Sequence, residues 1–276
     1  MRDIKIIALD LDGTLLNSQK KLSHRNLSAL RAAADRGIEI VPTTGRFYGG
    51  MPEEIRSLPF IHYVITINGA QVQRLADGEV LYRAEMSRPQ AVELMRVLDQ
   101  WPVAYDCYCN NGAFMTGALK EKIEDYTADV HYQNMVRQLR QSVPELRAWV
   151  ESQPHDVQKV QFFTENRAVK AQLMEELPRK FPDLIITSAI PSNVEINQRN
   201  ANKGQALLAL AQHLGYTAEQ VMAFGDGLND LSMIRAAGTG VVMANGFPEV
   251  KAVADLLAED CDHDGVAKVI EEVCLR

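Results

Sequence analysis

Short apolar runs that end abruptly in aspartate and glycine constrain this chain's fold more than any other feature. Residues 4–9 are mostly apolar and end at Asp10, and residues 221–224 end at Gly225 and Asp226. Apolar runs of this length are typical of strands that a parallel sheet buries on both faces. Segments with helical spacing follow these runs, so the order strand, helix, strand predicts right-handed crossovers and a parallel sheet with helices on both faces.

The two ends of the chain share this alternation, whereas the middle does not. In the outer parts we expect strands at 4–9, 38–42, 63–67, 221–224 and 239–243, and helices at 23–36, 48–57, 203–214, 230–237, 248–254 and 265–274. In the middle we expect helices at 87–100, 118–127, 133–151 and 166–178, and strands near 103–109, 157–163 and 183–188. An insertion at an exposed loop is tolerated physically. We therefore expect a second α/β domain, residues 84–189, inserted into a discontinuous domain made of residues 1–83 and 190–276.

Charge and hydropathy exclude several classes of partner. The formal net charge is −7 and the pI is about 5.4, so no basic excess exists to attract nucleic acid or an anionic membrane. No apolar run reaches the length of a membrane span or resembles a signal peptide. The four cysteines lack the spacing of a zinc site. We expect a cytoplasmic monomer or homodimer that acts on a small molecule, with neither nucleic acid nor membrane as partner.

Polar residues follow each expected strand of the outer domain. Ligands bind at the carboxyl ends of strands in an open parallel sheet, so these residues should converge there. Carboxylates in one crevice repel one another, and a divalent cation removes that repulsion. Ligands that are all oxygen favour Mg²⁺, which typically keeps a substrate phosphate as a further ligand. The carboxylates are Asp10, Asp12, Asp226 and Asp230, and the residues suited to phosphate are Thr44, Gly45, Lys203 and Asn229.

Each of these signals also has a plainer interpretation. Asp12-Gly13 is a hairpin-turn signal, and Asp226-Gly227 is an ordinary turn or resembles a calcium loop, although Ala237 stands where an EF-hand needs Glu. Thr44 could cap a helix. A lysine at a helix start, such as Lys203, could be merely solvated, although helix N-termini disfavour cations.

Two further positions stay open between a plain and a functional interpretation. Asn68-Gly69 is equally a turn signal and a substrate contact. Arg46 could contact phosphate or form a surface ion pair.

Taken in order, the motifs resemble those of the haloacid dehalogenase superfamily. The segment at 10–15 resembles its first motif, Thr44 its second, Lys203 its third and the segment at 225–230 its fourth. Thr44-Gly45-Arg46, Asn68-Gly69-Ala70 and Asn202-Lys203-Gly204 are similar to the Cof-type, or YidA-like, subfamily. Four ordered motifs are far more specific than any one alone. The resemblance implies an α/β fold with a doubly wound, Rossmann-like parallel-sheet core and an inserted α/β cap of the C2 type.

The same resemblance implies roles for the motif residues. Asp10 would attack phosphorus and form an aspartyl-phosphate, while Asp12 would act as general acid and then as general base. Mg²⁺ would be held by the Asp10 carboxylate, the Asp12 backbone carbonyl and Asp226, with Asp230 orienting metal-bound water. Lys203 would pair with Asp10 and the phosphoryl group. The phosphate would be cradled by the side chains of Thr44 and Asn229 and the N–H groups of Leu11 and Gly45, with Arg46 as a further candidate.

The implied activity is Mg²⁺-dependent hydrolysis of a phosphomonoester, with a sugar phosphate or a similar small phosphorylated metabolite as substrate. Two rivals remain at this point. A phosphomutase uses a similar aspartyl-phosphate but returns the phosphate to its substrate. A regulatory protein that binds a phosphorylated metabolite could keep the same fold, although it would need neither Asp10 nor Asp12.

Overall fold

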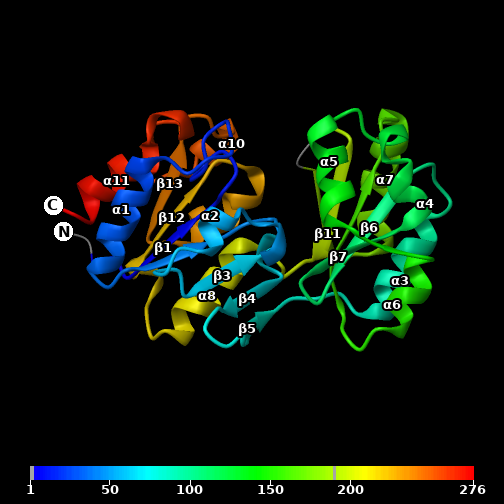
Figure 1. The fold of residues 1–276 in the computed structure, drawn as a ribbon, viewed down its shortest axis with the longest axis horizontal. Helices are drawn as coiled ribbons and strands as arrows, with labels where there is room; N and C mark the ends of the chain where they lie inside the picture. The colour runs from blue at the N-terminus through cyan, green and yellow to red at the C-terminus, as the bar shows by residue number, and fades with distance from the viewer. Residues whose placement is uncertain (1–2, 189–190) are drawn as a thin grey trace. The chain divides into compact units, whose positions relative to one another are not determined.

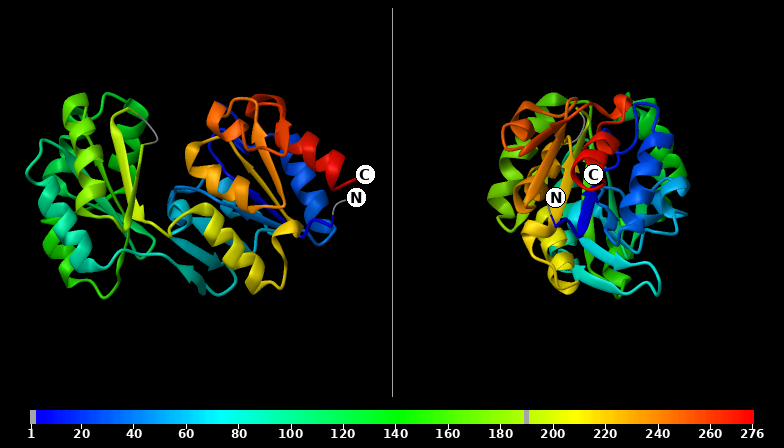
Figure 2. Two further views of the ribbon diagram at one scale, coloured as in Figure 1. Left: turned by 180° about the vertical axis from the view of Figure 1, so that it is seen from behind. Right: turned by 90° about the vertical axis from the view of Figure 1, so that its left-hand side faces the viewer.

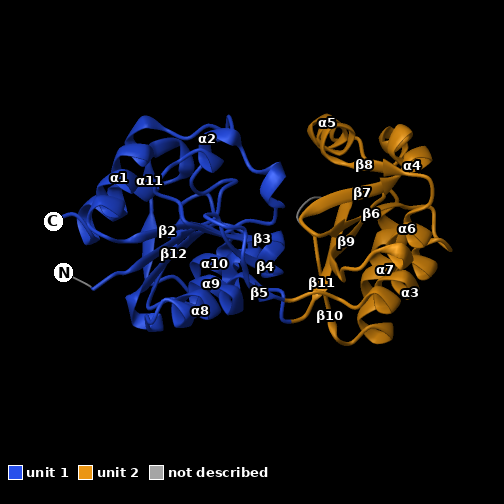
Figure 3. Cartoon of the chain, turned by 60° about the horizontal axis from the view of Figure 1, so that its bottom comes forward, with its two compact units in different colours: residues 1–83, 200–276 blue, residues 84–199 orange. Residues whose placement is uncertain are grey.

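The computed structural model describes residues 3–188 and 191–276, which divide into two units (Figure 3). Unit 1 comprises residues 1–83 and 200–276, and unit 2 comprises residues 84–199. The domain boundary expected between residues 189 and 190 lies outside the described residues. Strand β11 (Asn193–Gln198) pairs with strands β9 (Val157–Phe163) and β10 (Leu184–Thr187) of unit 2, so the chain returns to unit 1 only after Arg199.

A five-stranded parallel sheet forms the centre of unit 1 (Figure 1). Its order is β14 (Leu256–Ala258), β13 (Thr239–Met243), β12 (Val221–Gly225), β1 (Ile6–Leu9) and β2 (Glu39–Pro42). In register, Leu9 lies opposite both Phe224 and Pro42. Because these three strands end level, the residues after them, beginning with Asp10 and Thr43, emerge at one edge of the sheet.

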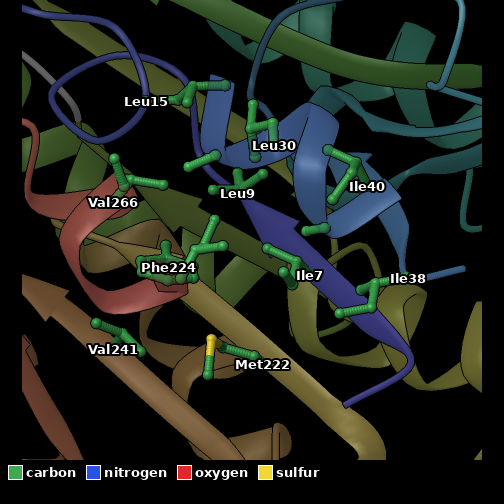
Figure 4. Packing of buried hydrophobic residues seen from close by; sticks show 14 of the residues in the cluster. Ile7, Leu9, Leu15, Leu30, Ile38, Ile40, Met222, Phe224, Val241 and Val266 are labelled. Atoms are coloured by element: carbon green, nitrogen blue, oxygen red, sulfur yellow. The ribbon is translucent and has the colours of Figure 1, made fainter. Parts of the chain in front are cut away.

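Alternating side chains of β1 explain why its sequence is apolar. Ile7 and Leu9 belong to the core on one face, together with Leu30 and Val266 (Figure 4). Ile6 and Ala8 belong to the core on the opposite face. Helices α1 (His24–Asp35) and α11 (Gly265–Val273) lie side by side on the first face, and α8 (Lys203–His213) and α9 (Leu231–Ala236) cover the second (Figures 1 and 2).

The third expected strand of the parallel sheet takes a different place. Strand β3 (Tyr63–Thr66) is the first strand of an antiparallel sheet with β4 (Gln71–Arg74) and β5 (Val80–Arg83). Among the described residues, a single parallel bridge, from Thr43 to Ile65, links β3 to the end of β2. The prediction that β3 is an ordinary member of the parallel sheet is therefore wrong. The turn Ile67–Gly69 reverses the chain directly after β3, so β4 pairs with β3 in the antiparallel direction and no crossover helix follows.

The helix expected at 48–57 is also interrupted. It consists of a 3₁₀ turn at Tyr48–Gly50 and helix α2 (Glu53–Arg56). Met51 between them is extended, with ψ 148°, because Pro52 disfavours a helical conformation in the residue before it. Unit 1 also contains α10 (Pro248–Lys251) and 3₁₀ turns at Ala218–Gln220, Leu228–Asp230 and Cys261–His263.

Unit 2 contains a separate six-stranded sheet, which is antiparallel except for its pair β7–β8. Its order is β10, β11, β9, β6 (Ala104–Cys109), β7 (Gly112–Thr116) and β8 (Gln141–Val143). Helices α3 (Arg88–Leu98), α6 (Leu146–Ser152) and α7 (Arg167–Lys180) pack on one face. Helices α4 (Gly117–Glu121) and α5 (Val130–Leu139) and a 3₁₀ turn at Ile123–Asp125 pack on the other. The parallel core sheet with its helices and this separate sheet confirm the expected fold class.

Two expected helices of unit 2 are broken in the structure. The helix expected at 133–151 is α5, β8 and α6 in succession, and the one expected at 118–127 is α4 followed by the 3₁₀ turn. The first break occurs at Arg140, which leaves the helical conformation with ψ 127°. Its guanidinium is fully buried, and its Nε donates to Asp106 Oδ2 at 2.8 Å, an ion pair that the helical spacing of the sequence does not reveal. None of the described helices has the length and apolar character needed to cross a membrane.

Candidate active site

A buried lysine joins two carboxylates at the carboxyl edge of the unit 1 sheet. Asp10 follows β1 directly, and Lys203 is the first residue of α8. Lys203 Nζ donates to Asp10 Oδ1 at 2.6 Å and to Asp230 Oδ1 at 2.5 Å. The side chains of Lys203 and Asp230 are 0% exposed, and that of Asp10 is 10% exposed. A cation at a helix N-terminus opposes the helix dipole, so these two carboxylates compensate an otherwise unfavourable position.

Asp226 completes a cluster of three carboxylates. One oxygen each from Asp10, Asp226 and Asp230 lies within 4.8 Å of the others. The N–H groups of Asp226 and Gly227 donate to Asp230 Oδ2 at 2.9 and 2.8 Å. Because Oδ1 accepts from Lys203, both oxygens of Asp230 already accept hydrogen bonds from the protein. Asp226 Oδ1 accepts from the hydroxyl of Thr14 at 2.8 Å. All of the candidate ligand atoms are oxygens, which fits a hard divalent cation held mainly by Asp10 and Asp226.

The cluster contains three carboxylates and one buried amine, so its negative charges are not fully balanced. Burial, and then the charge of Asp230, raise the pKa of Asp226 to about 6. The pKa of Asp10 is raised as well, mainly by burial. Lys203 opposes this shift, whereas the charges of Asp230 and Asp226 add to it. Burial lowers the pKa of Lys203, but Asp10 and Asp230 more than offset it and the pKa is raised. A second cation among these carboxylates would remove the repulsion that one lysine leaves.

Asp12 lies outside the three-carboxylate cluster and is paired with two cations. Arg46 holds it through two hydrogen bonds, Nε to Oδ2 at 2.8 Å and Nη2 to Oδ1 at 2.9 Å. Lys20 Nζ lies 3.0 Å from Oδ1. Burial raises the pKa of Asp12, but Arg46 and Lys20 outweigh it, so the pKa is lowered. Arg46 therefore forms an ion pair with Asp12 in this structure, which agrees better with the ion-pair interpretation of Arg46 than with a phosphate contact.

Sequence reasoning missed Lys20, because its contact depends on a turn. The side chain of Asn17 accepts from the N–H groups of Gln19 and Lys21, at 3.0 and 2.9 Å, and Lys20 is left-handed with φ 60°. This compact turn aims the Lys20 amine at Asp12. An asparagine before a short polar run is the one sequence signal for such a turn.

Asn245 is a second position that sequence reasoning missed. Its Nδ2 donates to the carbonyl of Gly13 at 2.8 Å, and its Oδ1 accepts from the N–H of Cys261 at 3.1 Å. Asn245 therefore ties the turn that follows Asp12 to the C-terminal segment.

The structure bears differently on the plainer interpretations of the motifs. A hairpin turn of the expected type requires positive φ at both central residues, and of the Asp12-Gly13 pair only Gly13 has it, at 88°. Asp226-Gly227 does lead into a turn, the 3₁₀ turn at Leu228–Asp230, for which Gly227 is the N-cap with φ −92°. Thr44 is buried and caps none of the described helices, since the next one begins at Tyr48 after Phe47.

Apart from Lys203, the candidate phosphate ligands lie on the turn after β1, on the loop at 44–46 and on the 3₁₀ turn at Leu228–Asp230. The N–H of Thr44 donates to the carbonyl of Ile65 at 2.9 Å, and the Thr44 hydroxyl accepts from the N–H of Arg46 at 3.2 Å. Asn229 Nδ2 donates to Asn68 Oδ1 at 3.3 Å. Leu11 is buried and its carbonyl accepts from Thr14 and Leu16, so it forms the turn after β1. Gly45 lies against Asn68, whose Oδ1 is 2.7 Å from where a Cβ on residue 45 would stand.

Comparison with known proteins agrees with this geometry. The family model of haloacid dehalogenase-like hydrolases matches residues 7–270. The chain is 32% identical to the 5-amino-6-(5-phospho-D-ribitylamino)uracil phosphatase YcsE of Bacillus subtilis, over 97% of this chain and 95% of that protein. It is 32% identical to an HMP-PP phosphatase of Klebsiella pneumoniae, over 95% and 93% of the two chains.

Solved structures agree as well. A haloacid dehalogenase-like hydrolase from B. subtilis superimposes with a TM-score of 0.83 at 28% identity, covering 98% of this chain and 100% of its own. With the match to the family model over nearly its whole length, the chain belongs to the haloacid dehalogenase-like hydrolases and is a phosphatase of that superfamily.

Proposed function

We propose that this chain hydrolyses phosphomonoesters of small metabolites through an aspartyl-phosphate on Asp10. The observation that carries the proposal is the group of Asp10, Asp226 and Asp230 near the buried amine of Lys203. A phosphoryl group with a divalent cation is the ligand that such a site suits, because the cation neutralises the carboxylates and the lysine neutralises the phosphoryl oxygens.

The metal that fits the donor set is Mg²⁺. Asp10 and Asp226 would hold it together with the backbone carbonyl of Asp12, and Asp230 would act only through the groups it already binds. When bound, the ion supplies charge neutralisation for the transferred phosphoryl group.

The chain's own residues supply the rest of the proposed reaction. A carboxylate oxygen of Asp10 bonds to phosphorus as the ester P–O bond breaks, and the Asp12 carboxyl gives its proton to the leaving oxygen. Asp12 then takes a proton from water, which attacks phosphorus and frees Asp10 and inorganic phosphate. The pairing of Asp12 with Arg46 and Lys20 favours its carboxylate form, which suits the second step. The first step requires the protonated form, so Asp12 would have to lose at least one of these two contacts before it acts as the acid.

The substrate class proposed is a sugar phosphate or a similar small phosphorylated metabolite. The names of the relatives, a phosphoribitylaminouracil phosphatase and an HMP-PP phosphatase, support the broader class. We further propose that unit 2, expected as the cap at residues 84–189, determines substrate choice, since all four motifs lie outside it. Substitutions in unit 2 should then change the ratios of kcat/KM between substrates.

Release of inorganic phosphate from a panel of phosphorylated metabolites, with Mg²⁺ or with EDTA, tests the proposal. We expect Mg²⁺-dependent release by the native protein and none by Asp10→Asn, whose amide is nearly isosteric and should leave the fold intact by circular dichroism. Substantial release by Asp10→Asn would refute the covalent route. Conversion of a sugar phosphate to its isomer without phosphate release would identify a phosphomutase, and tight binding without turnover would identify a regulatory protein.

A further inference from the structure

We infer that Asn68, which lies outside the four motifs, is a positioning residue that orients the proposed phosphate-binding amide of Asn229 and packs against Gly45. The inference rests on the proposed function. It starts from the turn between β3 and β4, defined here as the left-handed turn Ile67–Gly69.

The left-handed turn has an uncommon backbone. Ile67, Asn68 and Gly69 have φ values of 53°, 57° and 92°. Asparagine and glycine tolerate this region, but a β-branched residue such as isoleucine is an outlier there. Strained residues persist where the surroundings fix them, and they cluster at functional sites. Ile67 is fully buried, so the core of unit 1 holds the strain in place.

Contacts on both sides of the turn lead to candidate site residues. The N–H of Asn68 donates to the carbonyl of Thr44 at 3.0 Å, and the N–H of Ile67 donates to that of Arg46 at 3.0 Å. On the other side, a Cβ on Gly69 would lie 2.4 Å from the carbonyl oxygen of Asn202 and 2.9 Å from the N of Lys203. The turn therefore packs against the start of α8 and is bonded to the loop that carries Thr44.

The side chain of Asn68 continues this pattern. It is 6% exposed, and its Oδ1 accepts from Asn229 Nδ2 at 3.3 Å. An asparagine amide nitrogen carries two hydrogens, so a bond from one of them fixes the direction of the other. The same Oδ1 occupies the space that a side chain at residue 45 would take, so Asn68 packs against the backbone of Gly45. Asn68 thus orients one amide of the proposed phosphate cradle and packs against one of its backbone segments.

A plain turn needs none of these contacts, and the chain contains one for comparison. Asn110 and Asn111 form the turn between β6 and β7 with φ values of 46° and 60°, and Asn110 is exposed. Positive φ therefore accounts for an asparagine at either place. Burial and the bond to Asn229 distinguish Asn68.

The matched variants Asn68→Gly and Asn110→Gly separate the two roles. Glycine adopts positive φ without strain, so each change removes only the side chain. The melting temperature of each variant is measured to separate an effect on folding from an effect on phosphate binding. The measurements are KM and kcat for p-nitrophenyl phosphate, and the Kd of inorganic phosphate by calorimetry, which needs no turnover. We expect Asn68→Gly to raise KM and Kd about tenfold, the effect of weakening one charge-assisted hydrogen bond. Asn110→Gly should change neither.

Two further variants keep the inference falsifiable if Asn68→Gly folds poorly. Asn68→Asp preserves shape and tolerates positive φ, and its negative charge beside the cradle should weaken phosphate binding by more than tenfold. In an Asn229→Ala background the effect of Asn68→Gly should shrink, because Asn68 acts partly through Asn229. A Kd and KM for Asn68→Gly within twofold of native, or full additivity with Asn229→Ala, would overturn the inference. Absence of turnover in the native protein would overturn the proposed function instead, while the phosphate Kd would still test Asn68.

Discussion

Replacement of Lys203 by methionine should lower the free energy of unfolding of unit 1 by about 3–5 kcal/mol, the usual cost of removing one partner from a buried ion pair. Methionine fills a similar volume, so the loss is electrostatic. Lys203 Nζ lies 2.6 Å from Asp10 and 2.5 Å from Asp230, and the three side chains are at most 10% exposed. Carboxylate oxygens of Asp10 and Asp230 lie within 4.8 Å of each other. At an effective dielectric constant near 20, two like charges at that distance repel by about 3.5 kcal/mol, which lies within this range.

Denaturation in urea with EDTA, followed by far-UV circular dichroism, measures this loss. A change of 1 kcal/mol shifts Tm by roughly 2–4 °C in a unit of this size, so Tm should fall by about 6–20 °C. The matched control is Lys268→Met, which breaks the ion pair between Lys268 and Glu259, 2.5 Å apart. The Lys268 side chain is 35% exposed, so this change should lower the free energy of unfolding by less than about 1 kcal/mol. Asp10→Asn in the Lys203→Met background should restore part of the loss, because it removes one of the stranded charges. Equal stability of the Lys203 and Lys268 variants would refute the reasoning.

Three further predictions concern Asp12, Asp226 and Arg140. Asp12→Asn should slow the pre-steady-state burst of a sugar phosphate about 10²–10⁴-fold more than that of p-nitrophenyl phosphate, because only the sugar alkoxide needs a proton; equal slowing would remove Asp12 from the acid role. Since burial raises the pKa of Asp226 to about 6, its contribution to stability is present at low pH and is lost as the pH rises through 6. The increase in Tm on adding Mg²⁺ should therefore be larger at pH 7.5 than at pH 5, and equal increases would contradict this. Arg140→Met should destabilise unit 2 by about 3–5 kcal/mol in urea, since it strands the fully buried Asp106, and a loss below 1 kcal/mol would show that Asp106 is compensated otherwise.

The parallel strands could be predicted from the sequence because both of their faces are buried. β1 and β12 therefore consist of continuous apolar residues, and a polar residue marks where each one ends. β4 was not predicted, since Gln71, Gln73 and Arg74 give it no apolar run. The break at Arg140 was not predicted either, because its buried partner Asp106 lies 34 residues earlier in the chain.

The candidate site divides in the same way between local and distant information. Asp10 and Asp226 could be placed because each immediately follows a strand, and the register of the sheet brings strand ends together. The direction of Arg46 could not, since its contact with Asp12 depends on how two loops fold toward each other. Whether Asn68 was more than a turn residue depended on its contact with Asn229, which is 161 residues away.

The hydroxyl of Tyr82 donates to the carbonyl of Asn200 at 3.0 Å, so the chain leaves unit 1 and re-enters it at neighbouring points. From the point of view of unit 1, residues 84–199 are one long loop, and the structure of unit 1 holds the two ends of this loop close together. Loop-closure entropy grows only with the logarithm of length, so a loop of more than a hundred residues costs only about 3 kcal/mol more than one of four. A domain with its own core easily offsets that cost. Insertions of very different size and structure can therefore occupy this position without changing the catalytic sheet, and a few glycines joining Arg83 to Asn200 should leave a unit 1 that still folds.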